Sequence, residues 1–154
     1  MTEFSGRIDG RGKRVAIVIS RFNEAVTDAL HKGAVDEFVQ LGVAPESIDT
    51  FWVPGAFDLP PVLRRVAGRN EFDAVVCLGA VIRGETPHFD YISAEAAKGI
   101  SAVGQTSKCP VVFGVLTCDT AAQAKDRAGG KAGNKGSDVA RAALELSDLY
   151  TQLG

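Results

Sequence analysis

Four apolar runs rich in β-branched residues alternate with longer segments of helical periodicity, and this alternation constrains the fold more than any other feature of the chain. The runs span residues 14–20, 48–53, 74–80 and 111–116. Strands separated by helices are joined by right-handed crossovers, and they therefore lie parallel in one sheet. The sequence predicts a doubly wound, flavodoxin-like α/β fold of three layers, with a four-stranded parallel sheet in the order 2-1-3-4.

Helices are predicted between and after these strands. The first follows Asn23, which suits an N-cap, and stops at Gly42, where a glycine can end the last turn. Its apolar residues recur at four-residue steps, which places them on one face. The other helices are predicted at residues 60–68, 91–105, 120–128 and 137–153.

Length and composition limit the classes of function. With 154 residues, of which 45% are apolar and 23% charged, the chain is typical of one globular domain with a packed core. We expect this domain to span residues 14–154 and to follow an extended N-terminal segment, residues 1–13. A formal charge of -2 gives no global attraction for nucleic acid or anionic membranes, so we expect neither as a partner.

Cysteine and histidine positions indicate a reducing compartment and no metal centre. The three cysteines are odd in number, and Cys77 lies within an apolar run, as a buried thiol would. The two histidines are far apart, and no spacing matches a metal-ligand motif. No apolar run reaches the ~18 residues of a membrane-spanning helix, and residues 1–14 lack the apolar stretch of a secretory signal. We expect a cytoplasmic protein without a bound metal.

The N-terminal segment has no obvious place in the predicted sheet. Its isolated Ile8 lies between polar neighbours. The segment either pairs with the exposed edge strand of a neighbouring subunit or forms a frayed tail.

The candidate binding site lies in the loops that follow the strands. Ligands of doubly wound sheets bind beyond the carboxyl ends of the strands. Phe22 follows the first strand and either stacks on a planar ring or packs against the next helix. Asp58 follows the second strand and either accepts hydrogen bonds from hydroxyl groups or caps the helix that begins at Leu59.

His88 is the candidate proton carrier. It follows the third strand in a loop of turn-forming residues, with Asp90 nearby, and a histidine can transfer protons near neutral pH. The alternative is a solvated or helix-capping histidine. His31 lies in the middle of the first predicted helix, and we interpret it as structural.

A glycine-rich basic segment, residues 127–136, precedes the last predicted helix. It contains Arg127, Lys131 and Lys135. Cations beside the backbone amides of a helix N-terminus favour phosphate binding, and the alternative is a solvated, mobile connection. Neither a Walker loop nor a GxGxxG pattern occurs, so nucleotide binding has no support.

Five segments of the chain, in this order, resemble the lumazine synthase family. They are residues 20–23, 52–60, 79–91, 113–117 and 131–136. The resemblance implies a transferase of riboflavin biosynthesis that joins 5-amino-6-(D-ribitylamino)uracil to 3,4-dihydroxy-2-butanone 4-phosphate. The products would be 6,7-dimethyl-8-ribityllumazine, phosphate and water, and no cofactor would be needed.

The resemblance also implies which residues bind the aminouracil substrate. Phe22 would stack on the uracil ring. Backbone groups at the end of the third strand would pair with the polar edge of that ring: Ala80, Val81 and Ile82. Three residues after the second strand would hold the ribityl chain: Ala56, Phe57 and Asp58. Many family members have Glu at position 58 and Thr at position 80. This chain has Asp58, which is also a carboxylate, and Ala80, whose implied contact uses only backbone atoms.

The same resemblance implies a phosphate site and a proton carrier. Backbone groups of Glu85 and Thr86, together with the Arg127 side chain, would bind the phosphate of the second substrate. His88 would donate and accept protons. Lys135, with Asp138, would tune the charge nearby.

Family members assemble as pentamers with the site between neighbouring subunits, so Phe113 would enter the pocket of an adjacent subunit. Some members pack twelve pentamers into a hollow icosahedral shell, and the short link at residues 129–134 resembles the shell-forming type. Riboflavin synthase, which would consume the product, is the implied partner enzyme.

A flavin-binding or lumazine-binding module on the same fold is the main rival interpretation, because fold alone does not exclude it. The chain lacks the hydroxyl-rich phosphate loop of flavodoxins after the first strand, and simple storage gives His88 and Arg127 no purpose. A signalling receiver domain is set aside, because its acidic pair after the first strand is absent.

Overall fold

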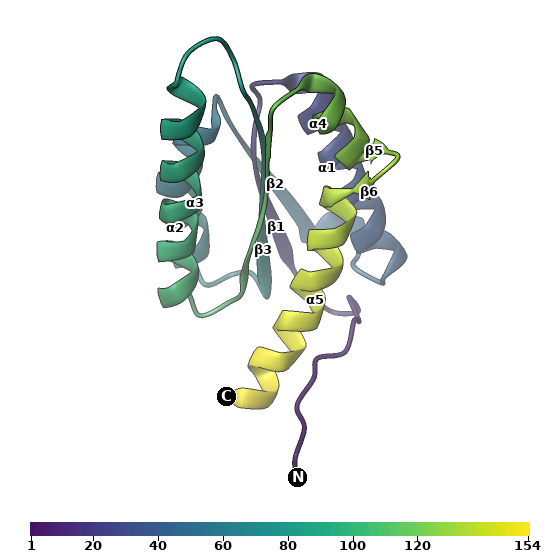
Figure 1. Ribbon diagram of the computed structural model, residues 1–154. Coiled ribbons are helices and arrows are strands. Elements are labelled where there is room, and N and C mark those ends of the chain that lie inside the picture. Colours follow the sequence, from purple (N-terminus) through teal and green to yellow (C-terminus); the bar gives the residue numbers. More distant parts are fainter.

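The computed structural model describes residues 1–154 and shows a three-layer α/β fold (Figure 1). A central sheet contains β1 (Val15–Ser20), β2 (Ile48–Val53), β3 (Ala74–Ile82) and β4 (Val111–Cys118). The strands are parallel and lie in the order β2-β1-β3-β4, which confirms the predicted architecture. The sheet ends on β2 at one edge and on β4 at the other.

Five helices cover the two faces of this sheet. In Figure 1, α2 and α3 lie on one side of it, and α1, α4 and α5 lie on the other. Two short 3-10 turns, η1 and η2, precede β2 and α2. None of the helices combines the length and apolar character needed to cross a bilayer. The bounds are α1 Glu24–Gln40, η1 Pro45–Ser47, η2 Ala56–Asp58, α2 Leu59–Gly68, α3 His88–Thr106, α4 Ala121–Arg127 and α5 Lys135–Leu153.

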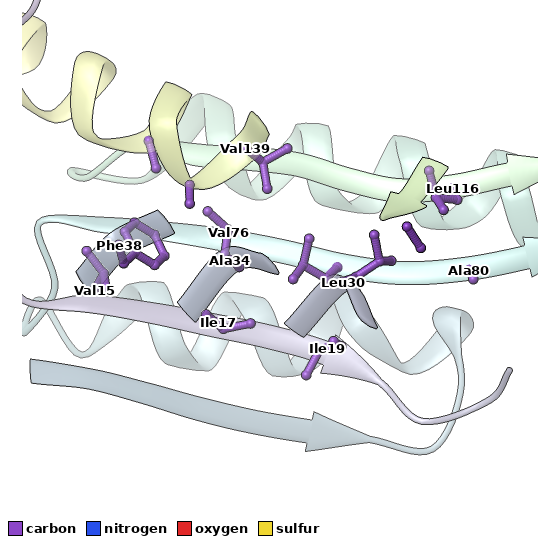
Figure 2. Packing of buried hydrophobic residues seen from close by; sticks show 14 of the residues in the cluster. Val15, Ile17, Ile19, Leu30, Ala34, Phe38, Val76, Ala80, Leu116 and Val139 are labelled. Carbon is purple, nitrogen blue, oxygen red and sulfur yellow. The ribbon is translucent and has the colours of Figure 1, made fainter. Parts of the chain in front are cut away.

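Strand β1 supplies both halves of the core. All six of its residues are buried, because it is a central strand covered by helices on both faces. Figure 2 shows Ile17 and Ile19 packed with Leu30 of α1, in the cluster on one face of the sheet. Ala16 and Val18 point to the other face and join the cluster formed with α2 and α3. The alternation of side chains along one strand therefore connects the three layers.

Several predicted boundaries differ from the structure, among them the end of β4, which is Cys118 rather than residue 116. Strand β3 continues two residues past Ala80, because Val81 and Ile82 remain paired with the last residues of β4. Helix α3 begins at His88, directly after Pro87 at its N-cap position, rather than at residue 91. Helix α5 begins at residue 135 rather than 137, because the Asn134 side chain accepts a hydrogen bond of 2.8 Å from the Gly136 N–H.

The glycine-rich segment forms an antiparallel hairpin of β5 (Ala128–Gly130) and β6 (Gly133–Asn134). Gly129 and Gly133 have φ values of 103° and 82°, which a residue with a Cβ adopts only with strain. The Asn134 side chain donates a hydrogen bond of 3.0 Å to the Ala29 carbonyl of α1. The hairpin is therefore bound to the body of the domain through Asn134.

The N-terminal segment has no regular secondary structure but contacts α5 of its own chain. The Arg7 N–H donates to the Asp148 carboxylate at 2.8 Å, and the Gln152 side chain donates to the Ser5 carbonyl at 2.8 Å. The hydrogen bond from Arg7 is the main cause of a lowered pKa at Asp148. Further along, the Gly10 N–H donates to the Leu41 carbonyl at 2.8 Å. In Figure 1 the segment descends toward the end of α5 accordingly.

Gly136 determines how closely α5 approaches α1. A Cβ at this position would overlap the Leu30 carbonyl of α1, which belongs to the helix backbone and has no rotamer to change. We expect Gly136→Ala to lower the free energy of unfolding by about 2 kcal/mol, the usual cost of forcing extra atoms into a packed contact. Urea denaturation measures this loss.

Gly68 is the matched control, because it is also helical but a Cβ added there would meet no atom within 4 Å. Alanine there should stabilise the protein slightly, by up to about 1 kcal/mol, through helix propensity alone. Equal effects of the two substitutions would contradict the proposed close contact.

Candidate active site

A hollow of about 440 Å³ lies at the carboxyl ends of β1, β2 and β3, where the doubly wound fold was expected to bind ligands. Its walls come from the loops after β1 and β2, the end of β3 and the beginning of α3. Thirteen residues line it, eight of them apolar: Phe22, Asn23, Gly55, Ala56, Phe57, Ala80, Val81, Ile82, Gly84, Thr86, His88, Phe89 and Ile92.

Two phenylalanines form an exposed apolar rim on this hollow. Phe22 is 72% exposed and Phe57 is 59% exposed, so neither contributes much to the core. The exposure of Phe22 argues against the alternative in which it packs on the following helix. Its backbone N–H donates to the Pro54 carbonyl at 3.0 Å, which joins the loops after β1 and β2. Both rings are therefore available for stacking against a planar ligand.

Asn23 occupies the predicted N-cap position of α1, but its side chain does not cap the helix. Its φ is 65°, and its side chain makes no capping hydrogen bond to α1. The side-chain amide instead donates to the Ala80 carbonyl at 2.9 Å. The residue therefore ties the first turn of α1 to the end of β3. Its only sequence signal was its residue type, since Asn tolerates the left-handed region better than most residues.

The end of β3 presents backbone groups toward the hollow. Its register with β1 stops at Leu78, whereas its register with β4 continues to Ile82. The N–H of Arg83 donates to the Cys118 carbonyl of β4, so odd-numbered residues here direct their backbone N–H and carbonyl groups toward β4. The backbone groups of even-numbered residues point toward the opposite edge of the strand, the side of β1. Ile82 therefore directs its N–H and carbonyl away from β4, past the end of β1, where a ligand edge can reach them.

Asp58 bonds within its own turn. Its carboxylate accepts a hydrogen bond of 3.0 Å from the Gly55 N–H, and it makes no side-chain bond to the N-terminus of α2. The carboxylate thus closes the η2 turn that contains Ala56 and Phe57. Asp58 does not itself line the hollow, but it supports the backbone of two residues that do.

His88 is the first residue of α3, is exposed, and lines the hollow. Its backbone N–H lies 3.4 Å from the Thr86 hydroxyl oxygen, while its imidazole makes no hydrogen bond within the chain. A helix-capping role for the side chain is therefore absent. The other histidine is different, because the His31 ring lies 2.9 Å from the Thr50 hydroxyl and packs on Trp52. Burial lowers the pKa of His31, in keeping with a structural role.

Five of the predicted site residues lie outside the lining of this hollow: Asp58, Glu85, Phe113, Arg127 and Lys135. Phe113 lies on β4 and borders a second hollow, of about 520 Å³, beside α3. Arg127 ends α4, where its guanidinium donates to the Gln123 carbonyl at 3.0 Å. Glu85 and Lys135 are exposed, before α3 and at the start of α5. One chain thus brings together eight of the thirteen predicted residues.

Arg127 nevertheless lies near the carboxyl end of β4. Burial raises the pKa of the Cys118 thiol at that strand end, and the positive charge of Arg127 opposes the shift.

The deeply buried Cys77 has its pKa raised by burial alone, so it stays a neutral thiol. All three cysteines are free. No group of three or more histidine, cysteine, aspartate or glutamate side chains converges as a metal site would require.

Comparison with known proteins gives two findings. The family model described as 6,7-dimethyl-8-ribityllumazine synthase matches residues 12–151, which is nearly the whole chain. Among solved structures, the chain is similar to a de novo designed Rossmann fold protein with a TM-score of 0.44 and 14% sequence identity. The match covers 73% of this chain and 90% of the designed protein.

Proposed function

Because the chain belongs to the 6,7-dimethyl-8-ribityllumazine synthase family, whose members are transferases of riboflavin biosynthesis, we propose that it condenses 5-amino-6-(D-ribitylamino)uracil with 3,4-dihydroxy-2-butanone 4-phosphate. The observation that supports these substrates is the convergence of three features on one hollow. They are the exposed Phe22 ring, the open backbone at the end of β3, and the unpartnered His88 imidazole.

The ring of the aminouracil would lie against Phe22, with its polar edge toward the end of β3. The carbonyl of Ala80 already accepts a hydrogen bond from Asn23, and the backbone groups of Val81 are directed toward β4, so Ile82 offers the freer backbone groups. The ribityl hydroxyls would reach the η2 turn, where Ala56 and Phe57 line the hollow and Asp58 supplies a carboxylate. In this arrangement the amine of the substrate would lie near His88.

The chemistry requires proton transfers and a leaving phosphate. The amine adds to the ketone, a water leaves to give an imine, phosphate is eliminated, and the ring closes with loss of a second water. The overall reaction has no net gain or loss of electrons, so a redox cofactor has no step to perform. His88 can carry protons between these steps, because its imidazole faces the hollow and is bonded to nothing else. Holding both substrates in one hollow supplies the remaining acceleration.

The phosphate would bind beside the first turn of α3. The backbone groups of Glu85 and Thr86 lie just before this helix, whose free N–H groups and dipole favour an anion. A cation would balance the charge of the departing phosphate. In one chain Arg127 does not line the hollow, so we propose that subunits share the site.

We propose a pentamer in which a neighbouring subunit supplies the missing residues. Phe113 and Tyr150 leave apolar surface exposed beside the edge strand β4, as an interface between subunits would require. Phe113 of one subunit would enter the hollow of the neighbour that covers this face. Arg127 and Lys135 of the same subunit would also reach the neighbour's hollow. Twelve such pentamers would form a shell, and the N-terminal segment would pair with a neighbouring sheet. Sedimentation tests the assembly, and a monomer would contradict the shared site.

Two further parts of the proposal concern the setting of the reaction. Three free cysteines support a reducing compartment, the cytoplasm. Riboflavin synthase, which uses the lumazine product, would be the partner enzyme.

The direct test is to mix the purified protein with both substrates and follow lumazine absorbance and free phosphate together. We expect both to rise at equal rates, well above the rate without protein. Binding of the aminouracil with no acceleration would favour instead a module that stores a lumazine or flavin.

A further inference from the structure

Arg83 lies behind the wall of the hollow, between the end of β3 and the beginning of α3. Its guanidinium donates to the Asp119 carboxylate at 2.8 Å and lies 3.4 Å from the Asp90 carboxylate. The same group stacks over the Phe89 ring, at 4.4 Å from the ring centre. Phe89 is buried and lines the hollow on its other side. One side chain thus contacts the two residues that directly follow His88.

The far end of this contact is held firmly. The Asp119 N–H donates to the Gln123 side chain at 2.8 Å, within the capping box that begins α4. The Arg83 N–H donates to the Cys118 carbonyl at 2.8 Å, and this hydrogen bond holds the Arg83 backbone against the end of β4. The guanidinium therefore connects the first turn of α3 to the turn between β4 and α4.

The first turn of α3 has few other restraints. Pro87 occupies its N-cap position without a side-chain capping bond, and the His88 backbone N–H donates only one hydrogen bond, to the Thr86 hydroxyl oxygen at 3.4 Å. Residues 83–88 are all exposed. The position of the His88 imidazole consequently depends on what holds Phe89 and Asp90.

We propose that Arg83 is a positioning residue for the reaction: by holding Phe89 and Asp90, it sets the position of His88 over the hollow. This inference rests on the proposed function. The ion pairs of Arg83 are largely exposed, and such pairs contribute little to folding stability. Loss of Arg83 should therefore change turnover more than stability.

The test compares Arg83→Ala with Arg69→Ala. Arg69 is a close match, because it also pairs with a carboxylate, Glu71, at 2.9 Å and lies over a phenylalanine, Phe51, at 6.0 Å. It lies at the end of α2, away from the hollow. We expect Arg83→Ala to lower kcat about tenfold, since small displacements of a catalytic group are costly. Arg69→Ala should leave kcat unchanged, and both melting temperatures should stay near that of the unaltered protein.

A double substitution separates positioning from a general structural effect. If Arg83 acts through His88, adding Arg83→Ala to His88→Ala should cause no further loss of kcat. The same tenfold loss in both backgrounds would overturn the proposal, as would an unchanged kcat in Arg83→Ala alone. Arg83→Lys should recover only part of the rate, because an ammonium cannot bond and stack as the planar guanidinium does.

Hydrogen exchange keeps the inference testable independently of turnover. We expect faster amide exchange at residues 86–92 in Arg83→Ala and unchanged exchange there in Arg69→Ala. If the unaltered protein showed no turnover, the proposed function would be wrong. The exchange rates at residues 86–92 would still show whether Arg83 holds the first turn of α3 in place. Equal exchange in all three proteins would overturn that role.

Discussion

Replacement of His88 by alanine is expected to lower kcat by about 10²-fold, with a much smaller change in the KM values of both substrates. The imidazole is the one uncommitted proton carrier that lines the hollow, and general acid–base groups typically contribute factors of this size. The backbone of the first α3 turn stays available for phosphate, so substrate binding should persist. Steady-state kinetics with each substrate varied in turn measures the two parameters separately.

His31→Ala is the matched control, because it removes the only other histidine of the chain. His31 bonds to Thr50 and packs on Trp52, so its loss should reduce stability and leave kcat within about twofold. A His88 variant with unaltered kcat would remove the assigned role. A loss of kcat accompanied by an equal loss in the His31 variant would point to folding rather than to proton transfer.

Arg127→Ala is expected to raise the KM for the phosphate substrate by about tenfold to a hundredfold, with a smaller effect on the KM for the aminouracil. A hydrogen bond to a charged group is worth about 1.5 to 3 kcal/mol, which corresponds to this range. The nearby Lys125 is the control for charge alone, since both cations belong to the last turn of α4. Lys125→Ala should leave both KM values nearly unchanged.

Co-expression of two impaired variants tests whether Arg127 serves a neighbouring subunit. Neither His88→Ala nor Arg127→Ala can form a complete site with copies of itself. If the two residues meet across an interface, mixed assemblies contain sites with an intact His88 from one subunit and an intact Arg127 from the next. The kcat/KM for the phosphate substrate should then exceed that of either variant alone. If both residues act within one chain, no site in the mixed assemblies is complete, kcat/KM does not rise, and the shared site is wrong.

The elements of the fold were predictable because their signals are local. The buried run from residue 15 to residue 20 could only be a central strand, and Gly42, with a φ of 111°, ends its helix as its residue type indicated. Boundaries were predicted less well. Residues 81 and 82 lie in β3 because β4 continues beside them, and that pairing partner is about 36 residues away in the chain.

The hairpin in the glycine-rich segment was missed for a related reason. Glycine has a low intrinsic preference for strands, so the composition of residues 128–134 favoured an irregular loop. Contact with α1 through Asn134 and the close approach at Gly136 stabilise the observed form. Both contacts involve residues about 100 positions earlier, and no local pattern reports them.

By itself the sequence determined the layer architecture, the strand order and the family, and it favoured His88 over His31 as the candidate proton carrier, because each inference depends on residue type and spacing within short segments. Only the tertiary structure decided that Asn23 bonds to Ala80 rather than capping its helix, and that Arg83 meets Asp119. It also decided that Phe113 lies away from the hollow. Asn23 and Ala80 are 57 residues apart in the chain, and Arg83 and Asp119 are 36 residues apart. Each pair meets because the order and register of the strands bring their ends together, and these depend on the whole sheet.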